Sequence, residues 1–411
     1  MFEIIREETG MLRVYIWGAG YYARQVIEEI DNTKAKILGI LDYDERKQGS
    51  RMFYPIPVLS PSYIVGRDFD YIIISVKNYE PVENECRKLR IEEKKIITYW
   101  KEKPDDYVFK KRAKRVEGLI QENKMLQYRL DSAPYEWGVK RTPKITGGAG
   151  LLKKIIKDRS SLCRFGDGEF EIIRGNERPW FQKLNQSLGR RLNEILITED
   201  ERINIAIAQD FTGLERYKED VADIIREYMF EDTRSCILRL LDENRVYYDA
   251  YVSRPYIIYK DKRNADEIFP LFKDVWRDRD VVIVEGEYSR IGVGNDLMEC
   301  ACSVSRIICP SRNAWDKYET ILNKVLEIVP KKALVCVSLG PSATVLAYDL
   351  AKEGYQALDI GQIDNEYEWY LTGAQKREKI PGKMVAELLV EQDFELKDEA
   401  VYRNQIIAKI V

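Results

Sequence analysis

The chain of 411 residues contains no histidine. Serine–histidine–aspartate and cysteine–histidine triads, histidine-ligated zinc sites and histidine-containing deaminase motifs all need an imidazole nitrogen, so the sequence excludes each of these classes. Any acid, base or metal chemistry must therefore use carboxylates.

Cysteine is scarce, and long apolar runs are missing. The 7 cysteines never have the Cys-x-x-Cys spacing and mostly stand in apolar runs such as 334–337, so we expect buried, reduced thiols. No stretch approaches the roughly 20 apolar residues that cross a bilayer, and the acidic start of the chain is unlike a signal peptide. These features predict a cytoplasmic protein without a transmembrane segment.

The charges nearly balance, with 66 Lys and Arg against 69 Asp and Glu, a formal net charge of -3. There is no overall basic field to hold a nucleic-acid backbone, so nucleic acid is not an expected partner. The composition, 45% apolar and 33% charged, is that of a soluble globular protein. At roughly 150 residues per domain, the length suggests two or three domains.

Residues 1–102 are predicted to form a Rossmann-like module with a parallel sheet. A β-branched and aromatic strand at 12–17 runs into a glycine turn and then a helical pattern through Ile30, and further strands are expected at 36–41 and 71–76. Gly18 and Gly20 would let the backbone approach a diphosphate, and Asp42 could hold a ribose hydroxyl. Such modules bind NAD, other nucleotides, nucleotide sugars or no ligand. An NAD-linked sugar oxidoreductase lacks an evident Tyr-x-x-x-Lys pair here.

Residues 103–144 are expected to be a helical linker. Apolar positions from Phe109 to Leu130 recur with spacings of 3 and 4, and Asn123 stands where a polar residue can fix register. The helix could form a homodimer contact or pack on its own protein. Its basic cluster could be a solvated face or contact the inner face of an acidic membrane. The cluster comprises Lys110, Lys111, Arg112, Lys114 and Arg115.

Residues 145–411 are predicted to form a second α/β domain. Short, continuously apolar strands indicate a sheet covered by helices on both faces. The expected strands are 162–165, 203–208, 281–284, 306–309 and 333–337.

Polar and glycine-rich segments follow these strands. Asp167 and Glu169 flank Gly168, which would let both carboxylates converge on Mg²⁺ or Mn²⁺ bridging to a substrate diphosphate; the alternative is a tight surface turn. The loop 285–297 offers glycine amides, an arginine and carboxylates, and 338–344 leads into a helix whose first N–H groups suit an anion. Because parallel strands end at one edge, these segments predict one cleft.

Five segments together resemble the GT-D type glycosyltransferases over about residues 145–385, and they are 164–169, 253–256, 285–297, 310–314 and 339–361. The resemblance implies a metal-dependent transferase that uses a nucleotide sugar, typically a UDP-hexose such as UDP-glucose. Relatives act in bacterial surface glycan assembly or adhesin glycosylation. The expected acceptor is a glycan, a glycoprotein or a lipid-linked sugar.

The resemblance also implies roles for individual residues. Asp167 and Glu169 fall on the Asp-x-Glu metal motif, and Gln362 stands where we expect histidine in relatives; its amide oxygen could reach a hard cation but cannot titrate. An inverting transfer would also need a base near the acceptor hydroxyl, and we expect either Glu287 or Asp296 to act as this base. The expected substrate-binding residues are Arg164, Gly166, Arg254, Ser289, Arg290, Gly292, Gly294, Asn295, Gly340, Ser342 and Thr344. The rival hypothesis is a non-catalytic nucleotide-sugar-binding or assembly protein of the same pathway, in which Gln362 marks a decayed site.

Overall fold

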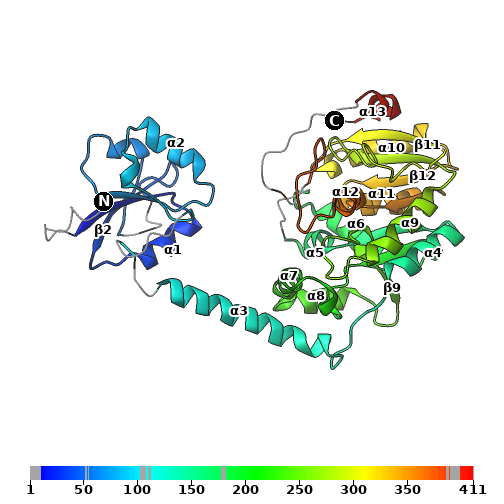
Figure 1. Cartoon of the computed structure of the whole chain (residues 1–411), viewed down its shortest axis with the longest axis horizontal. Coiled ribbons are helices and arrows are strands. Elements are labelled where there is room, and N and C mark those ends of the chain that lie inside the picture. Colours follow the sequence, from blue (N-terminus) through cyan, green and yellow to red (C-terminus); the bar gives the residue numbers. More distant parts are fainter. Residues whose placement is uncertain are drawn as a thin grey trace. The chain divides into compact units, whose positions relative to one another are not determined.

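The computed structural model describes residues 11–50, 53, 55–101, 108–109, 113–176, 182–385, 388 and 399–410. Two compact units divide the chain, one over residues 1–124 and one over residues 125–411. Each unit is built on its own parallel sheet (Figure 1). The prediction of an α/β protein with an N-terminal Rossmann-like sheet is confirmed.

The first unit contains a sheet with the strand order β3-β2-β1-β4-β5, in which every pairing is parallel. Its strands are β1 (Leu12–Trp17), β2 (Ala35–Leu41), β3 (Val58–Leu59), β4 (Tyr71–Ile74) and β5 (Ile96–Thr98). Its helices are α1 (Tyr21–Glu29) and α2 (Glu80–Lys88).

The alternation along β1 decides which helix covers which face of this sheet. Val14 and Ile16 point to the side where Ala23 of α1 is buried. Tyr15 and Trp17 point to the other side, in the same core as Cys86 of α2. Because successive side chains of a strand point to opposite faces, one apolar strand supplies both cores.

The second unit contains, within the described residues, a nine-stranded sheet with the order β14-β11-β10-β12-β13-β7-β8-β9-β6, again parallel throughout. The strands β7, β8, β10, β11 and β12 were expected from the sequence, whereas β6, β9, β13 and β14 were not. The strands are β6 (Lys144–Thr146), β7 (Ser161–Phe165), β8 (Ile203–Ile207), β9 (Val246–Asp249), β10 (Asp280–Gly286), β11 (Ser303–Cys309), β12 (Leu334–Ser338), β13 (Gln356–Asp359) and β14 (Ile406–Lys409).

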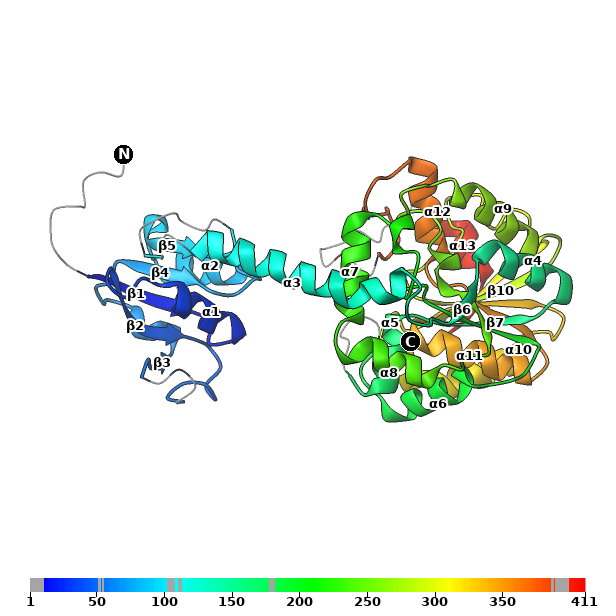
Figure 2. The same ribbon diagram turned by 90° about the horizontal axis from the view of Figure 1, so that it is seen from below.

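Helices cover both faces of this sheet, as the continuously apolar strands predict. Figure 2 shows α4, α9 and α12 on one side of it and α6, α10 and α11 on the other. The helices of the unit are α4 (Gly148–Asp158), α5 (Asp167–Arg174), α6 (Gln186–Leu196), α7 (Glu219–Met229), α8 (Asp232–Leu240), α9 (Asn264–Trp276), α10 (Tyr318–Ile328), α11 (Pro341–Lys352), α12 (Ile363–Thr372) and α13 (Glu399–Gln405).

A long helix, α3 (Ala113–Glu136), lies between the two sheets in the sequence. The helix continues past Pro134 and ends at Glu136. Within the second unit, ion pairs hold the carboxyl-terminal part of α3 to two other helices, one from Glu136 to Arg226 of α7 at 2.9 Å and one from Asp131 to Arg234 of α8.

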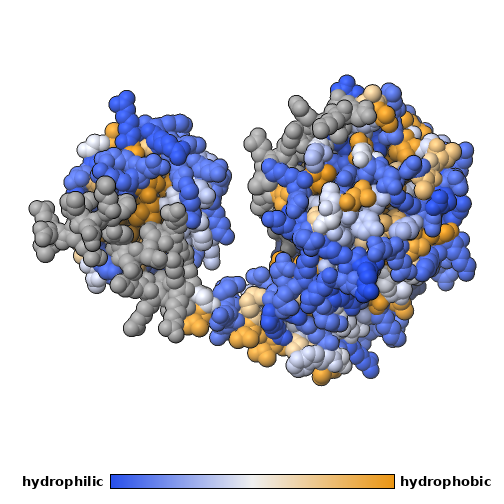
Figure 3. Space-filling view, viewed as in Figure 1, coloured by the Kyte–Doolittle hydropathy of each residue, from blue (hydrophilic) through white to orange (hydrophobic). Residues whose placement is uncertain are grey.

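The middle of α3 exposes apolar side chains. Leu119, Leu126 and Leu130 are 56%, 59% and 72% exposed, and Figure 3 shows apolar atoms gathered over this helix. The homodimer contact expected here stays a prediction. Of the basic cluster, residues 110–112 lie outside the described residues, as do the side chains of residues 114 and 115. Among the helices of the described residues, none has the length and apolar character needed to span a bilayer.

A buried ion pair closes the carboxyl end of β10. Arg306 of β11 donates from Nη1 to Oε1 of Glu285 at 2.5 Å, and both side chains are at most 2% exposed. Arg306 also donates from Nη2 to the carbonyl oxygen of Ile291 at 2.7 Å, while Oε2 of Glu285 accepts from the Ile291 amide at 2.8 Å. The pair therefore holds the loop that follows β10 against its own strand.

We expect Arg306→Ala to lower the free energy of unfolding by about 3–5 kcal/mol, because it leaves the Glu285 carboxylate buried without its counter-charge. Lys332→Ala, which removes an exposed partner of Asp280, is the control and should change the free energy by less than about 0.5 kcal/mol. Urea denaturation measures both values. Equal losses in the two variants would contradict the structural role of the buried pair.

Candidate functional site

A cavity of about 880 Å³ opens at the carboxyl edge of the nine-stranded sheet. It lies there because all nine strands run in one direction, so the segments that follow them meet at the same edge. The order of strands along the chain reverses between β7 and β13, since β8 and β9 continue to one side of β7 while β12 and β10 continue to the other side of β13. Such reversal points are where open α/β sheets bind ligands.

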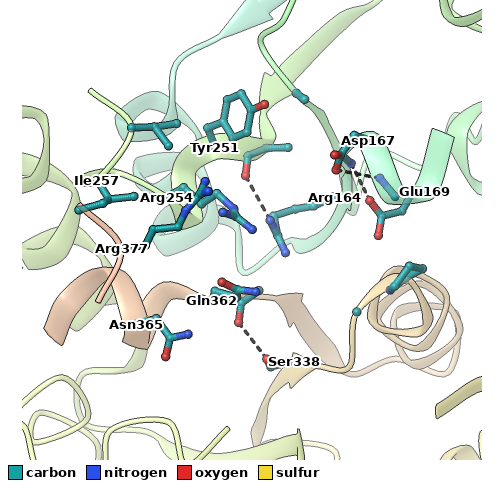
Figure 4. A pocket seen from close by; sticks show the side chains of 18 of the residues that line it. Arg164, Asp167, Glu169, Tyr251, Arg254, Ile257, Ser338, Gln362, Asn365 and Arg377 are labelled. Carbon is teal, nitrogen blue, oxygen red and sulfur yellow. Dashed lines mark hydrogen bonds between the residues drawn. The ribbon is translucent and has the colours of Figure 1, made fainter. Parts of the chain in front are cut away.

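Arg164 spans this reversal point (Figure 4). Its guanidinium donates from Nη2 to Oδ1 of Asp359 at 2.8 Å and from Nη1 to Oγ of Ser253 at 2.7 Å. The hydroxyl of Thr344 in α11 donates to the carbonyl oxygen of Arg164 at 2.8 Å. Arg164 borders the cavity, as predicted for a substrate-binding residue, and it also ties β7, β13 and the turn after β9 together.

The predicted acidic pair stands in the first turn of α5. Oε2 of Glu169 accepts from the Gly166 amide at 2.7 Å, and Oδ1 of Asp167 accepts from the Gly168 amide at 2.9 Å. Both residues border the cavity, and Asp167 is exposed to it. Burial, together with the nearby Asp359 carboxylate, raises the pKa of Glu169.

These side chains fit a divalent cation that the substrate also helps to bind. Gln362, at the start of α12, borders the same cavity as Asp167 and Glu169, so its amide could add a third oxygen donor. Among the described residues, no group of three or more aspartate, glutamate or cysteine side chains is placed to hold a metal ion alone. Mg²⁺ is commonly held by one or two carboxylates plus substrate phosphates, which is the donor set available here.

The structure brings only some of the predicted site residues to this cavity. The predicted residues that border it are Arg164, Gly166, Asp167, Glu169, Arg254, Ser289, Gly340 and Gln362. The predicted residues that are not part of its wall are Glu287, Arg290, Gly292, Gly294, Asn295, Asp296, Ser342 and Thr344.

The two carboxylates expected to act as base lie away from the cavity wall. Glu287 pairs with Lys409 at 2.9 Å. Asp296 accepts from Lys273 and from the hydroxyl of Tyr367, each at 2.6 Å. The bonds from Lys273 and Tyr367 lower the pKa of Asp296, which makes its carboxylate a weaker base.

The glycine loop after β10 binds its own chain instead of facing the cavity. The Gly292 amide and the Asn295 side-chain amide both donate to Oδ1 of Asp364, at 2.8 and 2.9 Å. Arg290 is buried and donates to the carbonyl oxygen of Gly382 at 2.6 Å. Lys383 donates to Oδ2 of Asp364 at 2.7 Å. The Gly292 amide, which looked suited to an anion, therefore binds the first turn of α12 instead.

Two further predicted residues lie inside α11. The hydroxyl of Thr344 is bonded to β7, as described above, and Oγ of Ser342 is buried with no hydrogen-bond partner among the described residues. Gly294 has a φ of +81° in the same loop as Gly292.

Several cavity residues were missed by the sequence analysis. Asp210 and Tyr251 follow β8 and β9, so the rule that strand ends build the cleft could have found them. Arg377 and Asn365 come from the segment at and after α12, where no strand end marks them (Figure 4). An apolar part of the wall comes from α7 and comprises Val221, Ile224, Ile225 and Tyr228.

The glycine turn of the first unit is closed by its own acidic residue. Gly18 has a φ of +107°, and a Cβ there would lie 2.5 Å from Cγ1 of Val76. Oδ2 of Asp42 accepts from the Ala19 amide at 2.8 Å and from Lys47 at 3.1 Å. A ribose hydroxyl would have to share this carboxylate. At Gly20, by contrast, a Cβ atom would have no other atom within 4 Å among the described residues, so there is space for a side chain.

Comparisons with known proteins match both units. The family model described as Glycosyltransferase GT-D fold matches residues 162–388, and the one described as C2185-like, N-terminal matches residues 10–97. A Streptococcus gordonii protein called probable glycosyl transferase Gly is 42% identical over 262 residues, 63% of this chain and 38% of that protein. Glycosyltransferase GlyD of Streptococcus pneumoniae serotype 4 is 38% identical over 269 residues, 65% of this chain and 33% of that protein. The matched segment thus spans between about a third and two fifths of the length of these relatives.

Solved structures match as well. One described as a new glycosyltransferase (DUF1792) from Streptococcus sanguinis is 38% identical with a TM-score of 0.61, and the match covers 66% of this chain and all of that one (100%). Another, described as the highly conserved domain of unknown function 1792 with a distinct glycosyltransferase fold, is 35% identical with a TM-score of 0.62 and covers 69% of this chain and 98% of that one.

The contact between Arg164 and the turn after β13 can be tested with a pair of glycines. Gly361 has a φ of +50°, and a Cβ there would lie 2.2 Å from Nη2 of Arg164, whereas Gly373, with a φ of +67°, has no atom within 4 Å of a built Cβ. Both Gly→Ala changes introduce backbone strain of about 1 kcal/mol or more. We expect Gly361→Ala to lower the free energy of unfolding by a further ~1–3 kcal/mol, since it also displaces the guanidinium from Asp359. Chemical denaturation of both variants gives the difference, and equal losses would contradict the role of Arg164.

Proposed function

The chain belongs to the glycosyltransferase GT-D fold family, and we propose that it transfers a hexosyl group, expected to be glucose, from a UDP-sugar to a glycan, glycoprotein or lipid-linked acceptor. The observation that supports this proposal is the acidic pair Asp167 and Glu169 on the wall of a cavity at the carboxyl edge of the sheet. Sugar transfer from a nucleotide diphosphate requires a site that stabilises the departing diphosphate.

Three features of the cavity suit a diphosphate. Asp167 and Glu169 would hold the cation, Mn²⁺ or Mg²⁺, with Gln362 as a further oxygen donor. A bound divalent cation would supply positive charge to the leaving diphosphate. The helix α11 begins on the cavity wall at Gly340 and Pro341, where the positive end of its dipole would favour an anion, and Arg254 and Arg377 border the same cavity.

The cellular role is proposed from the family. Assembly of bacterial surface glycans or glycosylation of an adhesin would take place in the cytoplasm or at the inner face of the membrane, where UDP-sugars are made.

The exposed leucines of α3 would suit a second copy of the chain, as the sequence pattern suggests.

Gln362 keeps one rival function open. If the amide cannot replace an ionisable ligand, the chain would bind a nucleotide sugar without transferring it. Hydrolysis of UDP-sugars, measured with and without Mn²⁺, separates the two functions, because a binding protein would be stabilised against heat by the donor yet release no UDP.

We expect Asp167→Asn to reduce Mn²⁺-stimulated sugar transfer by about 100-fold or more, because the variant loses the charge that holds the cation while keeping the side-chain size. Asp232→Asn is the matched control, since Asp232 is also the first residue of a helix, α8, but does not border the cavity. UDP release is measured over a range of Mn²⁺ concentrations with a panel of UDP-hexoses. Full activity of the Asp167 variant would refute the proposed metal site.

A nucleotide in the first unit is a separate proposal, which Gly20→Val tests. The space around Gly20 accepts a larger side chain, so the variant should keep its melting temperature and its rate of sugar transfer. If a diphosphate rests on the turn between Gly18 and α1, the valine side chain should abolish nucleotide binding to the first unit. This binding is measured by calorimetry with NAD, UDP and UDP-glucose in the presence of excess EDTA. Undiminished binding in the variant would exclude the turn as the nucleotide site.

A further inference from the structure

Among the described residues, six carboxylates border the cavity, and most of them already have a structural role or the metal-binding role proposed above. Those six are Asp167, Glu169, Asp210, Asp220, Asp359 and Asp364. Asp359 pairs with Arg164 and Asp364 with Lys383, while Asp220 is exposed in the first turn of α7. None of the ion pairs among the described residues includes Asp210, which is only 4% exposed.

Asp210 lies three residues after the end of β8, on the cavity wall and beside a tyrosine. The hydroxyl of Tyr251, from the turn after β9, donates to Oδ1 of Asp210 at 2.8 Å. Among the described residues, no hydrogen bond reaches its second oxygen, Oδ2. Since both Asp210 and Tyr251 border the cavity, a bound hydroxyl group could reach this carboxylate.

The surroundings of Asp210 bring its titration near neutral pH. Burial raises its pKa to about 7, and the buried carboxylate of Asp249 adds to this rise, while the hydrogen bond from Tyr251 opposes it. Two further polar side chains lie nearby: Tyr217 interacts with Asp210, and Arg254 interacts with Tyr251. A carboxylate whose pKa is close to the working pH is both available and basic enough to take a proton.

We propose that Asp210 is the general base that activates the acceptor hydroxyl, an inference that rests on the proposed glycosyl transfer. The acceptor O–H gives its proton to Oδ2 of Asp210, and the acceptor oxygen forms the new bond to C1 of the hexose. The bond from C1 to the diphosphate oxygen breaks, and its electron pair leaves with UDP. One displacement at C1 inverts its configuration in the product.

Asp210→Asn tests this assignment, because the amide keeps the size and can still accept from Tyr251. We expect kcat to fall by about 100-fold to 10,000-fold, while KM for the UDP-sugar stays within about twofold. The variant should melt no lower than the wild type at pH 8, since it removes a charge that is costly to bury. Asp280→Asn, at the opposite, amino end of β10, is the control and should keep the wild-type kcat.

The pH profile separates a base from a residue that only supports the fold. The ionised form of Asp210 is the active one, so wild-type kcat should rise with pH through an inflection near pH 7. Tyr251→Phe removes a hydrogen bond that favours the ionised form, so its inflection should move to higher pH while kcat at alkaline pH remains close to that of the wild type. In Asp210→Asn the inflection should disappear.

The outcomes distinguish this assignment from the proposed function. If the wild type transfers sugar but Asp210→Asn keeps its kcat, if the inflection survives in that variant, or if the product retains its configuration at C1, Asp210 is not the base. If the wild type releases no UDP from any donor, the transfer function itself fails. Should Asp210→Asn not fold, the shift expected for Tyr251→Phe still decides the question.

Discussion

The ion pair between Arg164 and Asp359 is the interaction on which the site depends. It joins β7 to β13 at the point where the strand order reverses, and the same guanidinium reaches Ser253 after β9. Only 4% of the Asp359 side chain and 17% of the Arg164 side chain are exposed, so each charge depends on the other to offset its loss of solvent. The strands β7 and β13 also pair at Leu162 and Leu358, and the ion pair adds to this backbone contact in fixing the distance between the acidic pair and Gln362.

The segments around the cavity are held by buried carboxylates that bind backbone amides. Glu285 holds the Ile291 amide, Asp364 holds the Gly292 amide, and Glu366 accepts from the amide of Ile257 at 2.9 Å. A charged acceptor makes a stronger hydrogen bond than a neutral one, which suits loops without regular structure. Some acidic residues therefore order the loops, and the sequence alone does not distinguish them from the acidic residues that only border the cavity.

This division explains how much of the fold and of the candidate site could be predicted from the sequence. The continuous apolar runs made β7 and β10 recognisable, and their carboxyl ends led to Asp167 and Glu169. Short strands at or near an edge, such as β6 and β14, lack such runs because only part of each strand is buried. The sequence did not show that Asp296 is held outside the cavity wall. Its partner Lys273 lies on α9, 23 residues earlier, and only the folded chain brings the two together.

The absence of histidine makes burial the natural means of obtaining a group that titrates near neutral pH. An exposed carboxylate has a pKa near 4 and is almost fully ionised, and therefore a weak base, at pH 7. The folded chain raises the pKa of Asp210 to about 7 and that of Asp249 to about 6, mainly by excluding water from them. Two neighbouring strands, β8 and β9, lead to these residues. The sheet thus supplies, through desolvation of aspartate, a function that an imidazole would otherwise serve, at the cost of keeping unpaired acidic groups in its interior.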